Sequence, residues 1–240
     1  MMADMHILRV GTRTSDLALA QASAAAQEIV DADPNLEGFE IVGITTKGDT
    51  DRSSLSQIGG TGLFTSAVRD ALLAGECDVA IHSAKDLPAA DHPELSMYFP
   101  ERVSPHDVFI GHTDYRGLPY GAKIGTGSPR RAAQLRHFRK DIQVVDIRGN
   151  VPTRIARIHD DLDGVILARA GLLRLGLDEG QDLPYEVMVP AAGQGTIAIE
   201  TVKGSPFEQS LERIDHATTR LEITAERTFM TILGAGCTTP

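Results

Sequence analysis

Cysteine is scarce in this chain of 240 residues, which contains only Cys77 and Cys237. A disulfide between them is not required, because a chain of this length can bury a large core, and a reducing compartment would disfavour it. We interpret Cys77 as a small buried hydrophobic residue at a strand entrance. Cys237 lies in the glycine-flanked segment 233–237, where burial in a core does not explain it.

Long apolar runs are also missing, since none approaches the ~18 residues that a membrane span needs. The first residues, Met1-Met2-Ala3-Asp4, lack the basic region and apolar stretch of a signal peptide. The composition, 42% hydrophobic and 23% charged, is typical of a globular protein. We therefore expect a cytoplasmic protein without a membrane partner.

Positive charge is in deficit, and the net charge of −10 argues against a nucleic acid as partner. The chain has no Gly-x-Gly-x-x-Gly segment and no phosphate loop ending in Gly-Lys-Ser/Thr. Its few cysteines and histidines do not have metal-ligand spacing. We expect neither a nucleotide nor a metal to be needed.

The basic residues that are present are mostly arginine, 18 of 23, and nine of these fall between residues 130 and 174. Arginine presents a planar donor fork that matches carboxylates and phosphates, so this enrichment suggests a small polyanionic ligand. The alternative is a solvated helix face paired with Asp and Glu, which we prefer for Arg136, Arg139, Arg157 and Arg169.

Short apolar runs alternate with helix-period stretches, which predicts an α/β protein with two units. The first unit has predicted strands at 6–11, 39–45 and 79–82, with helices at 17–32 and 63–74. The second has strands at 108–111, 123–125, 142–147 and 164–168, with helices at 129–138 and 152–160. Helical crossovers favour parallel sheets covered on both faces, with ligands at the carboxyl ends of the strands.

The proline-containing stretch 99–105 is typical of a crossing between domains. A strand at 195–201 follows a second candidate crossing, and helical spacing predicts a helix at 218–233.

Polar side chains directly follow the buried strand at 79–82, in the segment His82-Ser83-Ala84-Lys85-Asp86-Leu87-Pro88. An α/β sheet presents ligand-binding groups at such a place. An alternative for this segment alone is a surface turn in which Asp86 only pairs with Lys85.

The segment Gly125-Thr126-Gly127-Ser128-Pro129-Arg130-Arg131 runs from a strand through a glycine turn into a helix. Ser128 can cap that helix and Pro129 fits its first position. Arginines in the first turn oppose the helix dipole unless a negative group lies there, so we expect an anion at this turn. The segments 146–154 and 11–15 have a similar arrangement, and Gln21 follows the second of them.

Together these motifs resemble the hydroxymethylbilane synthase (porphobilinogen deaminase) family. The shared features are the His82–Pro88 segment, the Ser128–Arg131 turn, Arg148-Gly149-Asn150 with Arg154, Ala192-Gly193-Gln194-Gly195, and the helix leading into Gly236-Cys237. They occur in the family's order and approximate spacing over residues 6 to 240.

The resemblance implies two periplasmic-binding-protein-like lobes around a cleft, plus the start of a small third α+β domain that is truncated here. The implied boundaries are 1–100 with 199–216 for domain 1, 101–198 for domain 2, and 217–240 for the start of domain 3.

It implies as activity the deaminating, head-to-tail joining of four porphobilinogens into hydroxymethylbilane, by a cytoplasmic monomer that binds porphobilinogen and the growing polypyrrole. The implied primer is a dipyrromethane cofactor bound covalently to Cys237, and Asp86 is the implied catalytic carboxylate.

The resemblance also assigns arginine, hydroxyl and amide side chains to the carboxylates of cofactor and substrate. The cofactor group is Lys85, Thr126, Ser128, Arg130 and Arg131, and the substrate group is Arg13, Ser15, Gln21, Arg148, Arg154 and Arg174. Asp107 either faces the cleft or simply starts a strand.

Two features depart from the family. Gln57 and Thr61 stand in the glycine loop 56–62, where many relatives have lysines, and the family's third domain continues beyond the cysteine. A competing hypothesis is a non-catalytic two-lobed binding protein for a small polycarboxylate or phosphorylated ligand, because fold alone does not establish catalysis.

Overall fold

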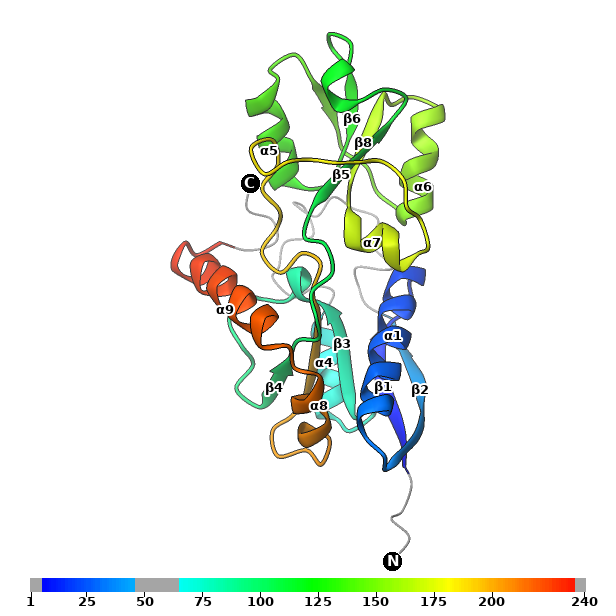
Figure 1. Ribbon diagram of the computed structural model, residues 1–240, viewed down its shortest axis with the longest axis vertical. Coiled ribbons are helices and arrows are strands. Elements are labelled where there is room, and N and C mark those ends of the chain that lie inside the picture. The colour runs from blue at the N-terminus through cyan, green and yellow to red at the C-terminus, as the bar shows by residue number, and fades with distance from the viewer. Residues whose placement is uncertain (1–5, 46–64, 236–240) are drawn as a thin grey trace, which may run out of the picture. The chain divides into compact units, whose positions relative to one another are not determined.

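The computed structural model describes residues 6–45 and 65–235, which form two compact units, each built on a five-stranded sheet (Figure 1). Within these ranges, unit 1 comprises residues 6–45, 65–102 and 196–235, and unit 2 comprises residues 103–195. Within the described residues the chain passes between the units at residues 102–103 and 195–196.

Unit 1 has the strand order β2-β1-β3-β10-β4. The first three strands are parallel, whereas β10 runs antiparallel to both of its neighbours. Their bounds are β1 (His6–Arg13), β2 (Leu36–Ile44), β3 (Val79–Ser83), β4 (Leu95–Tyr98) and β10 (Ile197–Val202). The helical elements are α1 (Asp16–Ala32), α4 (Ser66–Leu73), the 3-10 turn η1 (Ala84–Asp86), α8 (Glu208–Ile214) and α9 (Ala217–Ile232).

Alternation along the strands of unit 1 buries apolar side chains on both faces of the sheet. On one face Leu8 and Val10 of β1 pack with Ala25 and Ile29 of α1. On the other face α4 contributes Leu72 to a cluster that includes Cys77 and Ala80. The predicted burial of Cys77 is confirmed, with 2% of the residue exposed.

Unit 2 has the order β7-β6-β8-β5-β9, with β6, β7 and β8 parallel and β5 antiparallel. The strands are β5 (Asp107–Gly111), β6 (Lys123–Gly125), β7 (Gln143–Val145), β8 (Gly164–Ala168) and β9 (Gln181–Asp182). The helical elements are η2 (Tyr115–Gly117), α5 (Pro129–Phe138), α6 (Val151–Ala156), η3 (Arg157–His159) and α7 (Arg169–Arg174). Figure 1 shows α5 and α6 on opposite sides of this sheet, and each side has its own apolar cluster.

The predicted strands and helices within the described ranges are present, but the expectation of parallel sheets is wrong in part. Both sheets are mixed, because β5 and β10 each follow an extended crossing between the units. No helix intervenes to impose a parallel return. The short strands β4 and β9 and the short helices α7 and α8 were not predicted.

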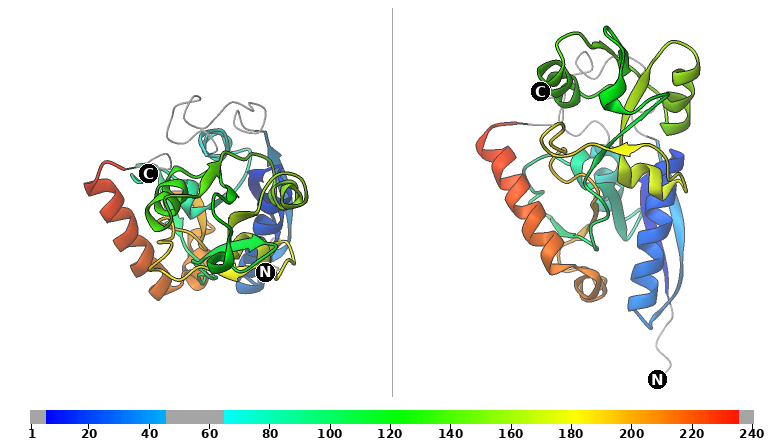
Figure 2. Two further views of the ribbon diagram at one scale, coloured as in Figure 1. Left: turned by 90° about the horizontal axis from the view of Figure 1, so that it is seen from above. Right: turned by 45° about the horizontal axis from the view of Figure 1, so that its top comes forward.

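Helix α9 spans 16 residues and belongs to unit 1 by its contacts. Figure 2 shows it as one continuous helix, and its buried residues are Thr219 and Ile223. Arg102 donates hydrogen bonds to two glutamates of α9, Glu226 at 2.7 Å and Glu222 at 3.1 Å. The proposed boundary of a third domain at residue 217 stays a prediction.

Candidate functional site

A polar pocket lies at the carboxyl ends of β1 and β3, inside unit 1. It brings together Arg13, Ser15, Gln21 and Asp86, four of the residues singled out in the sequence. Ser15 caps α1 by accepting the amide of Ala18 at 3.4 Å, so the turn after β1 faces this pocket. The other residues lining it are Thr12, Leu17, Ala18, Thr65, Ile81, His82 and Ser83.

Hydrogen bonds between elements fix the wall of this pocket. Ser83 at the end of β3 donates its hydroxyl to the side-chain oxygen of Gln21 on α1, at 3.0 Å. Gln21 is only 5% exposed, so this bond satisfies a buried polar group and ties α1 to β3. Gln21 thus has a structural contact in addition to its place in the pocket.

Asp86 ends the 3-10 turn η1, which extends β3 by one tight turn. The turn is held by Leu87, whose amide bonds the carbonyl of Ala84 at 3.3 Å and whose side chain is buried. Asp86 is half-buried and lines the pocket, whereas Lys85 is half-buried and is not among the lining residues. Asp86 therefore lies in a pocket with other predicted site residues, and its role as the catalytic carboxylate stays a prediction.

Beneath His82 lies a buried ion pair that sequence reasoning missed. Arg69 of α4 donates to both carboxylate oxygens of Glu200 on β10, at 2.8 and 2.6 Å. Nε2 of His82 is 3.4 Å from Glu200 but makes no hydrogen bond of good geometry among the described residues, so Arg69 is the principal partner. Burial alone would raise the pKa of Glu200, but His82 and Arg69 outweigh it and lower this pKa to about 2.

The second polar site is in unit 2, where β6 runs into α5. Ser128 caps α5 by accepting the amide of Arg131, and Pro129 occupies the first turn, as the sequence predicted. Thr126 is 3% exposed, and its hydroxyl accepts the amide of Ser128 at 3.2 Å. Gly127 admits no side chain, because a Cβ would lie 2.7 Å from the carbonyl oxygen of Ile147.

The sequence predicted an anion beside the arginines at the start of α5. The structure shows one such group within the chain itself, the carboxylate of Asp107. Asp107 at the start of β5 is completely buried and binds Arg131 through Nε at 3.0 Å and a terminal nitrogen at 2.6 Å. Its other oxygen accepts from Arg130 at 2.8 Å. Burial would raise the pKa of Asp107, but the charges of Arg131 and Arg130 lower it to about 2.

Three more predicted arginines lie in unit 2, and their positive charge is poorly compensated. Arg154 has a lowered pKa because of burial first and then because of the charges of Arg131 and Arg148, opposed only by Asp146. Nε of Arg148 is buried without a hydrogen-bond partner in the described part of the chain. Burial also lowers the pKa of Arg174 to about 10, and Arg174 donates to the carbonyl of Gly195 at 2.9 Å.

These arginines suit a ligand that carries carboxylates. Arg130, Arg131, Arg148 and Arg154 interact with only two carboxylates in the described residues, Asp107 and Asp146, so the site has an excess of positive charge. An unpaired buried cation is unstable unless an anion approaches it. The residues present therefore fit the acidic side chains of a pyrrole cofactor or substrate.

The arginines assigned to the helix surface behave differently. Arg139, Arg157 and Arg169 form ion pairs with Asp141, Asp161 and Asp182, as the sequence led us to expect. Such pairs are local and leave no surplus charge. Arg136 is exposed, as expected, but has no ion pair among the described residues.

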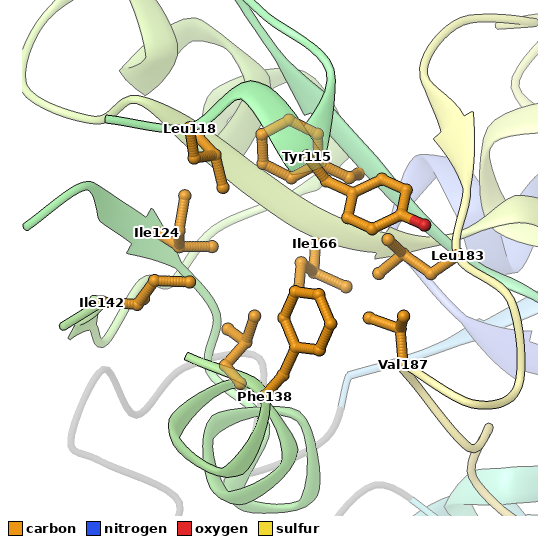
Figure 3. A pocket seen from close by; sticks show the side chains of 10 residues that line it. Tyr115, Leu118, Ile124, Phe138, Ile142, Ile166, Leu183 and Val187 are labelled. Atoms are coloured by element: carbon orange, nitrogen blue, oxygen red, sulfur yellow. The ribbon is translucent and has the colours of Figure 1, made fainter. Parts of the chain in front are cut away.

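An apolar cavity in unit 2 is not part of either polar site. Figure 3 shows Tyr115, Ile124, Phe138 and Leu183 pointing toward one another around it, and its walls belong to the cluster beneath α5. It offers no charged group to a ligand, so we assign it to the core.

Several expectations fall on residues that the structure does not describe. Cys237, Gln57 and Thr61 lie outside residues 6–45 and 65–235. Within those ranges no group of three or more His, Cys, Asp or Glu side chains could hold a metal, and no helix is long and apolar enough to cross a membrane.

Sequence reasoning missed or left undecided the groups behind the sites, namely Arg69, Glu200, Asp107 and Gln194. Local signals existed for two of them. A glutamate in the apolar strand 197–202 and an aspartate opening the apolar strand 107–111 must each find a partner when buried, but the sequence does not say which.

Comparison with known proteins shows which protein family the chain resembles. Residues 8–209 match the family model described as porphobilinogen deaminase, dipyromethane cofactor binding domain. A porphobilinogen deaminase of Leifsonia xyli is 48% identical over 97% of this chain and 74% of its own length. Porphobilinogen deaminase 1 of Streptomyces coelicolor is 46% identical over 97% of this chain and 76% of its own length.

Among solved structures, the methionine binding protein MetQ is similar with a TM-score of 0.52, covering 92% of this chain and 95% of that one at 11% identity. That likeness concerns the fold alone, and with the two mixed sheets it confirms an α/β fold with two binding-protein-like lobes. The family model and these relatives show that the chain belongs to the porphobilinogen deaminase family.

Proposed function

We propose that this protein is a hydroxymethylbilane synthase, a transferase that joins four porphobilinogens head to tail with loss of ammonia, in tetrapyrrole biosynthesis. The observation that carries the proposal is the position of Asp86, which shares one pocket with Arg13, Ser15 and Gln21 in a chain of the porphobilinogen deaminase family. We propose that it acts in the cytoplasm as a monomer on porphobilinogen and the growing polypyrrole.

Asp86 supplies the charge that the reaction needs. When the amino group of the aminomethyl substituent of porphobilinogen leaves as ammonia, the methylene carbon stays on the ring, and the resulting azafulvene carries a positive charge shared with the ring nitrogen. A carboxylate that accepts a hydrogen bond from the pyrrole N–H stabilises this charge. The α-carbon at the end of the growing chain attacks this methylene carbon, and after the new carbon–carbon bond forms the attacking α-carbon gives up its proton, for which Asp86 is the proposed acceptor.

The other side chains bind and orient. Arg13 and Ser15 provide a cation and a hydroxyl beside Asp86 in unit 1. In unit 2, Arg130, Arg131, Arg148 and Arg154 suit the acetate and propionate groups that each porphobilinogen brings, with Thr126 and Ser128 beside them. We propose supporting substrate contacts for Gln21 and Arg174, and a cofactor contact for Lys85.

The family's dipyrromethane would be held by Arg130 and Arg131 through its carboxylates and by Cys237 through a thioether. When bound, it supplies the pyrrole end from which the chain grows. The non-catalytic binding protein is the weaker hypothesis, because the relatives that match nearly the whole chain are named porphobilinogen deaminase and the likeness to a binding protein is one of fold.

The decisive test replaces Asp86 with asparagine in the full chain. We expect Asp86→Asn to lower the rate of hydroxymethylbilane formation by about 10²-fold or more, with little change in melting temperature, because the amide keeps the shape but loses the charge.

The matched control is Asp78→Asn, just before the amino end of the same strand, where Asp78 binds Arg9 at 2.6 Å. It should lower the melting temperature and leave turnover close to wild type. Near wild-type turnover in Asp86→Asn would refute the role of Asp86.

A further inference from the structure

Arg130 and Arg131 at the start of α5 are held by two side chains outside that helix. Asp107 of β5 binds both arginines, and Gln194, just before the chain returns to unit 1, binds Asp107. Together with Arg130 and Arg131 they form a buried group, here called the Asp107 network. Three of its members are buried, with exposed fractions of 0% for Asp107, 1% for Gln194 and 7% for Arg131. A set of polar groups this deeply buried must be fully matched, donor to acceptor, to be stable.

The contacts fix the orientation of each member. Gln194 donates from Nε2 to Asp107 at 2.8 Å and to the carbonyl of Pro105 at 2.7 Å, and its oxygen accepts from Arg131 at 3.3 Å. Turning the amide over would place its oxygen against a carboxylate and a carbonyl, so only one orientation is stable. Arg131 also donates to the carbonyl of Ile166 at 3.1 Å, which anchors it to β8.

The network leaves a net positive charge. Two guanidinium groups share one carboxylate, and the charges of Arg148 and Arg154 lie close enough to add to it. Asp107 therefore does not neutralise the positive charge of the site. It holds two cations side by side that would otherwise repel, while Nε of Arg130 makes no hydrogen bond among the described residues.

From this geometry we infer that Asp107 and Gln194 are positioning residues that hold Arg130 and Arg131 in place to receive the carboxylates of the dipyrromethane cofactor. The inference rests on the proposed function. It adds to that function a requirement for two residues that touch neither cofactor nor substrate, and it identifies cofactor loading as the step that they serve.

The test measures loading rather than turnover. Apo-protein, produced without porphobilinogen, is incubated with porphobilinogen, and the fraction of chains that gain the mass of the cofactor is followed by intact mass spectrometry. We expect Asp107→Asn to slow loading by at least about tenfold, which corresponds to losing roughly one charged hydrogen bond. Both oxygens of Asp107 only accept, so either orientation of the new amide turns its nitrogen toward a donor.

The matched control is Asp141→Asn in the same unit. Asp141 also pairs with an arginine, Arg139, and also has a pKa lowered to about 2, first because of its hydrogen bond from Arg139, but it precedes the amino end of β7. This variant should load at the wild-type rate. Equal slowing in both variants would mean that the loss is one of general stability and would overturn the inference.

Gln194→Met provides a second variant in case Asp107→Asn does not fold. It keeps both arginine–aspartate pairs and nearly the same volume but removes the donor that fixes Asp107. We expect this variant to load the cofactor more slowly than wild type. Loading at the wild-type rate together with a lowered melting temperature would show that the Asp107 network only stabilises the fold, and would overturn the inference. If the wild-type protein itself gains no cofactor mass and makes no hydroxymethylbilane, the proposed function fails rather than this inference.

Discussion

At the scale of single residues, the sites are distinguished by side chains whose burial is not matched by partners. Arg148 is the clearest of them, because its buried Nε finds no acceptor in the described residues and the neighbouring Arg154 adds a like charge. Structural arginines of the same unit, such as Arg157, have a carboxylate within bonding distance. We expect Arg148 to gain such a partner when an anionic ligand binds.

Replacing Arg148 with lysine tests this. The variant keeps one charge and loses the planar fork, so binding of the growing chain should weaken by about 1–3 kcal/mol per lost charged hydrogen bond. We expect chain growth to stall, which mass spectrometry would detect as protein carrying one, two or three added pyrroles. The melting temperature should stay near wild type, and a lowered melting temperature with an ordinary ladder of masses would instead make Arg148 structural.

At the scale of elements, β10 joins the two halves of unit 1. It lies between β3 and β4, and through Glu200 it also binds α4, which precedes it by more than a hundred residues. The ion pair of Glu200 therefore helps to hold α4 against the sheet. Removing one partner of a buried ion pair leaves the other charge uncompensated, which is strongly destabilising. Substitutions at this ion pair should therefore lower the stability of unit 1 more than most others.

We expect Glu200→Gln to lower the free energy of unfolding by about 3–5 kcal/mol, because it leaves Arg69 buried without a full counter-charge. The pKa of Glu200 is lowered to about 2 in the folded state, from about 4.5 for an unperturbed glutamate. The folded protein thus gains stability above pH 4.5 that is lost as pH falls toward 2, and the variant should lack this part of the acid dependence. Denaturant titrations at several pH values measure both effects.

The control for this substitution is Glu222→Gln on α9, whose carboxylate pairs with Arg102 but is 47% exposed. It should cost less than about 1 kcal/mol. A loss as large as that of Glu200→Gln would show that burial is not the reason for the sensitivity.

At the scale of the whole molecule, the chain carries a net charge of −10 while its two sites contain arginine. The acidic surface disfavours nucleic acid, and the local positive charge favours small carboxylates. The chemistry proposed for Asp86 and these arginines uses neither a metal nor a nucleotide. We expect desalted protein to keep full activity in EDTA and without ATP, and a loss of activity that zinc or ATP restores would contradict the assignment.

Much of this could be predicted from local sequence. Apolar periodicity predicted α1, β3 and α5, and the capping of α5 by Ser128 follows from a serine before a proline at a helix start. The grouping of Arg13, Ser15, Gln21 and Asp86 was also within reach, because parallel strands end at the same edge of a sheet.

Tertiary structure alone decided how buried charges are paired. Asp107 and Arg131 are 24 residues apart, and Arg69 and Glu200 are 131 apart, so no local pattern connects them. It also decided the strand directions, because β5 and β10 follow crossings between the units rather than helices. The sequence by itself determined which elements form and where polar groups leave the strands. Which charge lies beside which depends on contacts between segments far apart in the chain, and these exist only once both sheets are assembled.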